Sequence, residues 1–245
     1  MPTAIITGGA VRLGKSFALH LANKGYNIAL HFSKMRPAVK SVLDQLNSMD
    51  IKSKYYNCDF SNIENAEKLI DKVSQDFSDV TLLINSAANF IQENIETTNS
   101  KNLLETFHIN LFSPFILMRE YKKMFNKGMI VNILDERILR NIPTFAAYSV
   151  SKVGLAHLTR IASIEWGTTI RVNGIAPGLI LPPVGQDDNY LKRESKHVPT
   201  GKHGSPENLI KGLDYLLENT FVNGEILFID GGESINPGYT FNQQK

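Results

Sequence analysis

The apolar residues of the chain fall into short continuous runs that alternate with longer segments of helical periodicity. Short runs rich in β-branched side chains are typical of strands buried on both faces of a parallel sheet. Strands are therefore predicted at residues 3–7, 26–32, 51–58, 80–84, 129–134, 169–175 and 225–229. Apolar residues at helical spacing predict helices at residues 15–24, 37–49, 61–77, 101–125, 146–166 and 206–218.

The order of these elements predicts the fold class. Strands alternate with helices throughout, which requires right-handed crossovers and a parallel sheet covered by helices on both faces. No internal repeat and no linker divides the 245 residues. We therefore expect an α/β protein with a single domain over residues 1–245, built on a Rossmann-type, doubly wound parallel sheet of about seven strands.

Two segments lack the regular pattern. Residues 181–205 are rich in proline, glycine and charge and show no clean period. Irregular segments of that length are usually lids or binding elements, and this one follows the carboxyl end of a strand, where doubly wound sheets bind ligands. We expect residues 181–205 to be a substrate loop and residues 233–245 to be a C-terminal tail.

Composition narrows the classes of partner. Lys and Arg total 26 and Asp and Glu total 24, which gives a net charge of +2. This near balance of charge does not favour nucleic acid as a partner. No run of about 18 apolar residues could cross a membrane, and the single Cys58 suits a reducing compartment. We expect a soluble cytoplasmic protein. The histidines show no ligand spacing, so no metal site is predicted.

The first predicted strand runs into a glycine-rich turn and then a helix. Gly8 permits the tight turn, and Gly14 allows the helix to pack closely on the strand. The N-terminus of such a helix offers backbone N–H groups to a pyrophosphate. Arg12 stands where a third glycine might be expected. The alternative is a plain tight turn.

The second predicted strand ends in His31, Phe32, Ser33 and Lys34. A site selective for NAD places an acid there to bind the ribose 2′-hydroxyl, whereas this chain has no Asp or Glu before Asp44. Ser33 and Lys34, helped by Arg36 or His31, could instead hold the 2′-phosphate of NADPH. The alternative is a solvated basic loop.

Tyr148 and Lys152 are four residues apart in a predicted helix and therefore share one face. We expect the ammonium to lower the phenol pKa from its ordinary value of about 10, which makes Tyr148 a candidate proton donor near neutral pH. Asp135 follows the preceding strand. Because helices also carry such Tyr–Lys pairs by chance, the pair is evidence for catalysis only if the rest of the chain builds a nucleotide site around it.

These motifs together resemble the short-chain dehydrogenase/reductases, from one end of the chain to the other. The matching positions are Thr7-Gly8 with Gly14, Asp59, Asn85-Ser86-Ala87, Asn110, Tyr148 with Lys152, Pro177-Gly178 and Asp230-Gly231-Gly232. The resemblance implies that Tyr148 is the acid, that Lys152 lowers its pKa and binds the nicotinamide ribose, and that Asn110 holds a proton-relay water. It implies cofactor contacts at Gly8, Arg12, Leu13, Gly14, His31, Ser33, Lys34, Asp59, Phe60, Asn85, Ser86, Ala87, Tyr148, Lys152, Pro177, Gly178 and Leu179. It also implies a homotetramer.

One departure points to a branch of that family. The family usually places a serine where this chain has Asp135. With Arg12 and the basic segment after the second strand, this looks like the pteridine reductases and the similar bacterial dihydromonapterin and dihydrofolate reductases. In that branch an aromatic residue stacks on the pterin, and Phe90 occupies the matching position in this chain. The branch often has a serine two residues before that aromatic residue, where this chain has Ala88. The resemblance implies catalysis by Asn110, Asp135, Tyr148 and Lys152, and substrate contacts at Arg12, Phe90, Asp135 and Tyr148.

The function expected from this resemblance is NADPH-dependent reduction of a dihydropterin or folate. Two alternatives remain open: a carbonyl or 3-oxoacyl thioester reductase, and an inactive NADPH-binding sensor. Single residues also have plainer interpretations. Asp135 could be an ordinary loop acid, Phe90 a core residue, and Asn110 the mark of a local helix irregularity.

Overall fold

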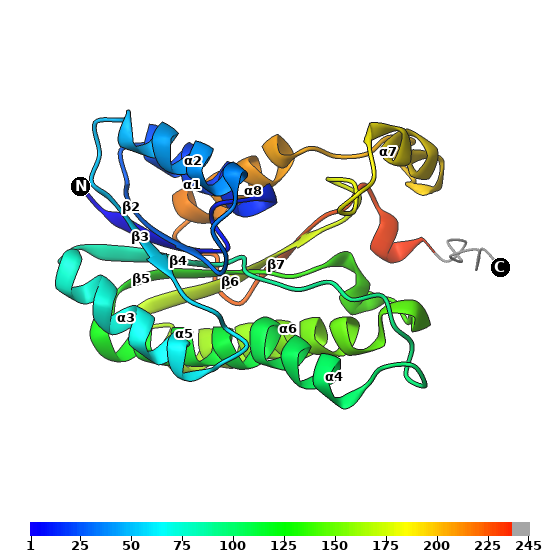
Figure 1. Ribbon diagram of the computed structural model, residues 1–245, viewed down its shortest axis with the longest axis horizontal. Coiled ribbons are helices and arrows are strands. Elements are labelled where there is room, and N and C mark those ends of the chain that lie inside the picture. Colours follow the sequence, from blue (N-terminus) through cyan, green and yellow to red (C-terminus); the bar gives the residue numbers. More distant parts are fainter. Residues whose placement is uncertain (237–245) are drawn as a thin grey trace.

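The computed structural model describes residues 1–236 and contains one seven-stranded parallel sheet with the strand order β3-β2-β1-β4-β5-β6-β7 (Figure 1). The strands are β1 Thr3–Thr7, β2 Asn27–Phe32, β3 Ser53–Asn57, β4 Val80–Asn85, β5 Gly128–Ile133, β6 Ile170–Pro177 and β7 Ile226–Ile229. The strand order reverses between β1 and β4, and a doubly wound sheet binds its ligand at such a reversal. The predicted fold class is confirmed.

Helices cover both faces of the sheet, as Figure 1 shows. Helices α1, α2 and α8 lie on one face, and α3, α5 and α6 lie on the other. The helices are α1 Arg12–Asn23, α2 Pro37–Asn47, α3 Glu64–Asp76, α4 Ser100–Phe107, α5 Ser113–Met124, α6 Ala146–Trp166, α7 Asp188–Glu194 and α8 Pro206–Glu218. The layered architecture buries the sheet on both sides and leaves the strand ends for binding.

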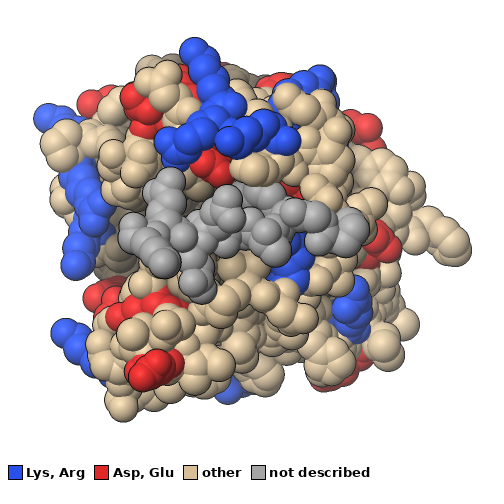
Figure 2. All heavy atoms as spheres, turned by 90° about the vertical axis from the view of Figure 1, so that its right-hand side faces the viewer, with Lys and Arg blue, Asp and Glu red and all other residues tan. Residues whose placement is uncertain are grey.

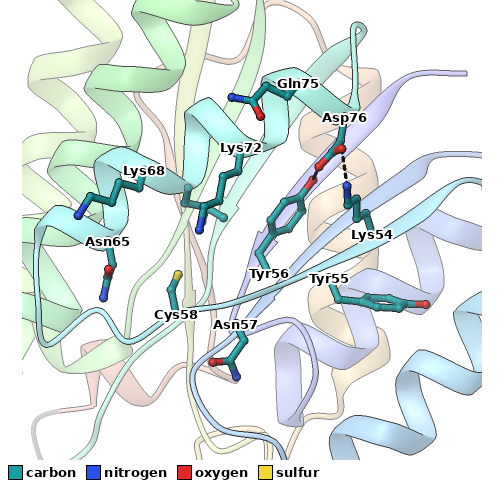
Figure 3. A pocket seen from close by; sticks show the side chains of 11 residues that line it. Lys54, Tyr55, Tyr56, Asn57, Cys58, Asn65, Lys68, Lys72, Gln75 and Asp76 are labelled. Carbon is teal, nitrogen blue, oxygen red and sulfur yellow. Dashed lines mark hydrogen bonds and ion pairs between the residues drawn. The ribbon is translucent and has the colours of Figure 1, made fainter.

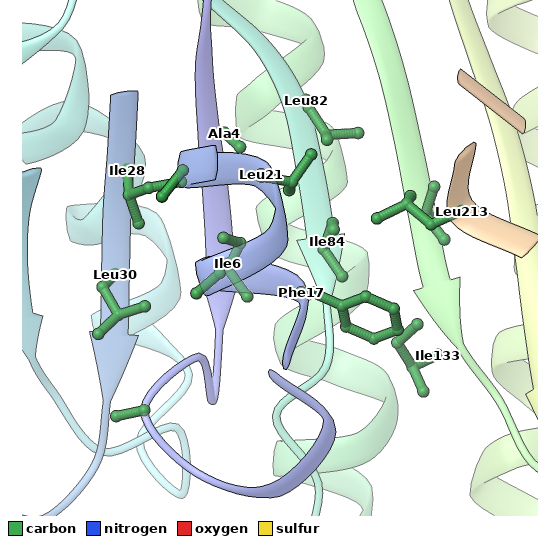
Figure 4. Close-up of a cluster of buried hydrophobic side chains, with 14 of the residues drawn as sticks. Ala4, Ile6, Phe17, Leu21, Ile28, Leu30, Leu82, Ile84, Ile133 and Leu213 are labelled. Carbon is green, nitrogen blue, oxygen red and sulfur yellow. The ribbon is translucent and has the colours of Figure 1, made fainter. Parts of the chain in front are cut away.

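The two largest hydrophobic clusters hold the layers together, one on each face of the sheet. The cluster beneath α1 joins Phe17 and Leu21 to Ile6, Leu30 and Ile84 of the strands (Figure 4). The other joins α3, α5 and α6 to the opposite face. Because both faces of the strands are packed, β1 and most of β2 are buried at every position, as expected for central parallel strands.

The predicted helix at residues 101–125 is interrupted. A π-helical turn, η1 His108–Phe112, separates α4 from α5. Pro114 lies in the first turn of α5, where its missing N–H has no intrahelical partner to lose. The break therefore precedes the proline, and it places Asn110 within the irregular turn.

Residues 181–205 are more regular than the sequence pattern indicates. They contain α7 and a 3-10 turn, η4 Ser195–His197, both short and both charged. Of the expected C-terminal tail, Glu233–Ile235 forms a 3-10 turn, η5, and residues 237–245 lie outside the described part of the chain. Figure 1 places α7 beyond the carboxyl ends of the strands.

Candidate active site

The turn after β1 is shaped to bring backbone N–H groups to the surface at the reversal point. Gly8 has a φ of +61°, and a Cβ there would lie 2.9 Å from the Cα of Ala87. A Cβ at Gly14 would collide with the carbonyl of Gly8. Within residues 1–236 no side chain caps the N-terminus of α1, and its first turn carries no acid. This geometry fits a pyrophosphate bound to the helix N-terminus.

Arg12 begins α1 with a φ of +49°, in the left-handed region that favours glycine. This conformation explains why a glycine was expected at the position. The Arg12 side chain is exposed, so it adds a cation beside the N–H groups of the helix terminus.

Thr7 ties the two turns at the reversal point together. Its hydroxyl oxygen accepts the N–H of Ser86 at 3.0 Å and of Ala87 at 3.1 Å, and the hydroxyl donates to the carbonyl of Ile84 at 3.4 Å. Strand register also pairs Thr7 with Asn85. Thr7 belongs to the Thr7-Gly8 motif, but the sequence did not reveal this bridging role.

His31 does not have the predicted role. Its ring is buried and stacks on Phe60, with ring centroids 4.0 Å apart. The N–H of Gly8 donates to Nδ1 at 3.2 Å, so Nε2 carries the proton and donates to the carbonyl of Cys58 at 2.9 Å. Burial lowers the His31 pKa to about 4. Both ring nitrogens are engaged within the protein, so His31 supports the glycine turn and cannot also bind a 2′-phosphate.

Ser33 and Lys34 are exposed in the turn between β2 and α2, where a cofactor phosphate could reach them. Asp59 is also exposed at the end of β3, and it accepts the N–H of Ser61 at 2.9 Å. Phe60 is buried against His31. The side chain of Phe60 therefore supports the adenosine end of the predicted site from below.

A cavity of about 310 Å³ lies apart from the glycine turn, between β3 and α3 (Figure 3). Asp76 binds the Lys54 ammonium at 2.5 Å and the Tyr56 hydroxyl at 2.7 Å on its wall. None of the predicted catalytic side chains lines it. The cavity therefore does not mark the reaction centre.

The predicted reacting groups meet at the carboxyl end of β5. The hydroxyl of Tyr148 on α6 donates to Oδ2 of Asp135 at 2.8 Å. The Lys152 ammonium donates to the carbonyl of Ile133 at 2.7 Å and lies 5.8 Å from the centre of the Tyr148 ring. Tyr148 and Lys152 are both buried. Asp135 thus contacts the phenol of Tyr148 directly, which an ordinary loop acid would not do.

The predicted lowering of the Tyr148 pKa is wrong for the protein without ligands. Burial and the neighbouring Asp135 carboxylate raise the Tyr148 pKa well above its usual value, and the charge of Arg137 only partly opposes them. Burial also lowers the Lys152 pKa, to about 8. A carboxylate that accepts the phenol hydrogen bond favours the protonated phenol. Tyr148 therefore holds its proton throughout the neutral range.

Asn110 is fully buried in the π-helical turn η1. Its side chain accepts the N–H of Asn89 at 2.9 Å and donates to the carbonyl of Asn89 at 3.1 Å. It also contacts the Ser151 hydroxyl at 3.2 Å, which in turn donates to the Tyr148 carbonyl at 2.6 Å. The helix irregularity thus falls at a predicted site residue, and π-helical turns are frequent at functional sites.

Phe90 forms one wall of the site. Its ring stacks on Phe145 with centroids 4.2 Å apart and meets the edge of Tyr148 at 4.7 Å. Phe90 is 44% exposed, so it is not a core residue. The guanidinium of Arg137 lies 5.1 Å from the Phe90 centroid and 4.8 Å from that of Phe145. Phe145 and Arg137 are not marked by any motif in the sequence; the available signal was an arginine two positions after Asp135.

The segment Pro177–Leu179 at the end of β6 is fixed by the C-terminal turn. The Glu233 carboxylate accepts the N–H of Leu179 at 2.6 Å, and a Cβ at Gly178 would collide with it. Asp230 accepts the N–H groups of Gly232 and Ser234 at 2.9 and 2.8 Å. The sequence did not predict the contact made by Glu233.

The grouping of side chains, the polarity of the helices and the surface charge bear on the class of site. Across residues 1–236, no three His, Cys, Asp or Glu side chains gather in a way that could hold a metal ion. No helix in that part of the chain is both long and apolar enough to cross a membrane. On the face shown in Figure 2, basic and acidic side chains are interspersed, so no single sign of charge covers it.

Comparison with known proteins now decides the family. A family model described as Enoyl-(Acyl carrier protein) reductase matches residues 9–234. The chain belongs to the short-chain dehydrogenase/reductase family. As a member of this family it is an oxidoreductase, and the family-level resemblance is confirmed.

Relatives within the family have varied activities. The chain is 28% identical to an uncharacterized oxidoreductase of Thermotoga maritima, over 94% of this chain and 96% of that protein. It is 25% identical to 3beta-hydroxysteroid dehydrogenase 1 of Eggerthella lenta, over 98% and 97%. These identities do not single out a substrate.

Solved structures are similar over the whole fold. FolM alternative dihydrofolate reductase 1 from Brucella canis, complexed with NADP, matches with a TM-score of 0.89 at 25% identity, over 100% of this chain and 98% of that one. The Brucella suis protein, also in complex with NADP, matches with a TM-score of 0.87 at 25% identity, over 96% of each chain.

Proposed function

We propose that the protein is an NADPH-dependent reductase of a dihydropterin, such as dihydromonapterin, dihydrobiopterin or dihydrofolate. The observation that carries the proposal is the 2.8 Å hydrogen bond from Tyr148 to Asp135, beside the partly exposed ring of Phe90. A flat heteroaromatic substrate can stack on Phe90. Its ring N–H groups are donors, and a carboxylate is the matching acceptor.

The cofactor assignment has separate support. The glycine turn and uncapped α1 terminus fit a pyrophosphate. Lys34 and Ser33 are exposed after β2, where an acid selective for NAD would stand. Both FolM structures contain NADP. In the proposed complex, Lys152 would hold the nicotinamide ribose, and residues 177–179 would also contact the cofactor.

Tyr148 acts as the general acid in this proposal. When bound, NADPH would supply hydride to a carbon of the substrate, and a ring nitrogen of the substrate would then need a proton. The Tyr148 pKa is raised by burial and by Asp135, so the phenol carries the proton to be delivered. Its hydroxyl turns from Asp135 to the nitrogen, while Asp135 is free to accept a ring N–H. Asn110 fixes the segment that carries Phe90.

The alternatives fit the site less well. A ketone or thioester reductase needs a donor for the substrate oxygen beside the tyrosine, whereas Asp135 as a carboxylate can only accept. An inactive sensor would have no need for a phenol, an ammonium and an amide brought together by β5, α6 and η1. We also propose that the chain assembles as a homotetramer, as the family resemblance implies.

A panel of substrates tests the proposal. NADPH oxidation is measured with dihydromonapterin, dihydrobiopterin, dihydrofolate and a 3-oxoacyl thioester, using native protein, Asp135→Ser and Tyr148→Phe. We expect native turnover of at least one pterin, a sharp loss in Asp135→Ser, and a loss of roughly 10²–10⁴-fold in Tyr148→Phe because the general acid is removed. NADPH binding without turnover would favour the sensor. Turnover of the thioester alone would overturn the pterin assignment and leave the reductase fold.

A further inference from the structure

We propose that Arg137 is a positioning residue for proton delivery, and that its guanidinium offsets the second negative charge created when Tyr148 gives up its proton beside Asp135. The inference rests on the proposed reductase function.

Proton delivery creates an electrostatic problem in this site. The Tyr148 hydroxyl and Oδ2 of Asp135 are 2.8 Å apart. After the phenol releases its proton, two negatively charged oxygens would face each other at about that separation in a buried setting, where like charges repel strongly. A nearby cation must therefore lower the free energy of the phenolate.

Lys152 is poorly placed to do this alone. Its ammonium is engaged with the carbonyl of Ile133 at 2.7 Å and lies 5.8 Å from the centre of the Tyr148 ring. Burial lowers its pKa to about 8, so its charge begins to be lost just above neutral pH. A second cation that stays charged is required at the Asp135 side.

Arg137 meets that requirement through two contacts with Asp135. The Arg137 backbone N–H donates to Oδ1 at 3.0 Å, which turns Oδ2 toward Tyr148. The Arg137 side chain then folds back, and Nη1 lies 3.8 Å from Oδ2. One residue thus orients the carboxylate and places a positive charge next to the oxygen that faces the phenol.

The guanidinium is also held in place. The side chain is only 14% exposed and lies near the rings of Phe90 and Phe145, a contact that favours arginine over lysine. Burial acts to lower its pKa, but Asp135, Tyr148 and Glu136 outweigh burial and raise it. Arg137 therefore stays charged over the whole working pH range.

Other titratable groups around Arg137 do not replace this role. Glu136 is engaged by Arg140 at 3.2 Å, whereas Nε of Arg137 is 4.0 Å from it. Tyr190 of α7 and Glu233 of η5 interact with Arg137 electrostatically. Asp135 on the same turn and Tyr148 on α6 complete the set. Of these groups, only Asp135 both lies within 4 Å of the Arg137 guanidinium and accepts the hydrogen bond of the Tyr148 hydroxyl.

The experiment measures kcat, KM and their pH dependence for native protein, Arg137→Gln and Arg137→Lys, each in the Asp135 and the Asp135→Asn background. Dihydropterins and a reactive diketone serve as substrates. We expect Arg137→Gln to lose roughly ten- to a hundredfold in kcat at neutral pH, the effect of one charge-assisted interaction. The loss should appear in kcat, and KM for NADPH should stay within about twofold.

The second background separates positioning from folding. In Asp135→Asn no like-charge pair forms, so Arg137→Gln should cost less than about threefold there. Arg137→Lys should recover part of the rate, and Arg140→Gln, which removes a neighbouring buried charge, serves as control. Equal losses in both backgrounds, or a native rate in Arg137→Gln, would overturn the inference. If native protein reduces the diketone but no pterin, the proposed substrate is refuted, and the Arg137 variants still test the positioning role of Arg137. If native protein reduces neither substrate, both proposals are refuted.

Discussion

At the scale of single residues, burial sets the charge states around the candidate site. It raises the Glu136 pKa to about 7, with Asp135 adding to the effect, and it lowers the Lys152 pKa to about 8. It lowers the His31 pKa to about 4. Each shift reflects the cost of holding a charge away from water. The site therefore keeps His31 neutral and the phenol of Tyr148 protonated at neutral pH.

The buried His31 predicts a loss of stability in mild acid. Its folded-state pKa is about 4 and its ordinary value is 6.5, so the unfolded chain binds the proton first. The neutral ring therefore contributes fully to the free energy of unfolding above pH 6.5. This contribution falls as the pH drops toward 4, by at most about 3 kcal/mol. Urea unfolding from pH 7 to pH 4.5 should show this loss in native protein and in the exposed control His157→Gln. A His31→Gln variant with an equally steep loss would contradict the assignment.

Sequence reasoning identified His31 as chemically interesting but gave it the wrong role. In a central parallel strand both faces are packed, and β2 is buried from Ile28 to Phe32. The alternation that normally separates inner from outer side chains is therefore missing. The sequence predicts that a histidine stands at the end of this strand. Tertiary packing decides where its ring points and that it contacts Gly8. Tertiary packing likewise decides that the Arg137 side chain folds back onto Asp135.

At the scale of elements, the seven strands were predicted almost to their ends because buried β-branched runs are strong signals. The helix containing Asn110 was predicted as one piece, since a π-turn keeps helical spacing on both sides and adds one residue locally. Helix α7 was missed because it spans only Asp188–Glu194 and its charges hide any apolar stripe. Short charged elements depend on docking, which a local pattern does not contain.

The turn between β2 and α2 carries the prediction for cofactor choice. Changing Lys34→Glu reverses an exposed charge where a 2′-phosphate is expected. Loss of one charge-assisted contact, about 1.5–3 kcal/mol, should weaken NADPH binding at least tenfold while NADH binding changes little. Fluorescence titration with both cofactors measures this. Lys40→Glu, an exposed site on α2, controls for general charge reversal, and equal affinity of native protein for NADPH and NADH would contradict the assignment.

At the scale of the whole molecule, topology alone brings the site together. The strand order reverses between β1 and β4, so the glycine turn, the Asn85–Ala87 turn and the end of β5 meet at one edge of the sheet. Thr7 is thus paired with Asn85, and Asn85 with Asn132, although these residues are far apart in the sequence. The same topology leaves α4, η1, α5 and α6 with exposed apolar residues: Leu103, Leu104, Phe112, Phe115, Val150, Val153, Ile161 and Ile164. These elements contact one another, and exposed apolar side chains that gather on one side of a protein often mark an interface; we call these eight residues the apolar face.

That face carries the prediction for assembly. Ile164 of α6 is 85% exposed and Ile161 is 47% exposed; burying them against a second copy would remove apolar surface from water at about 25 cal/mol per Å². We expect native protein to be a tetramer by light scattering, and Ile161→Glu with Ile164→Glu to dissociate it, because two carboxylates would be buried without partners. Ile95→Glu is a matched control, since Ile95 is 87% exposed in the loop after β4 and the substitution adds the same charge outside the face. A native protein that stays monomeric at micromolar concentration, or a double variant that stays tetrameric, would mean that these helices do not form the interface.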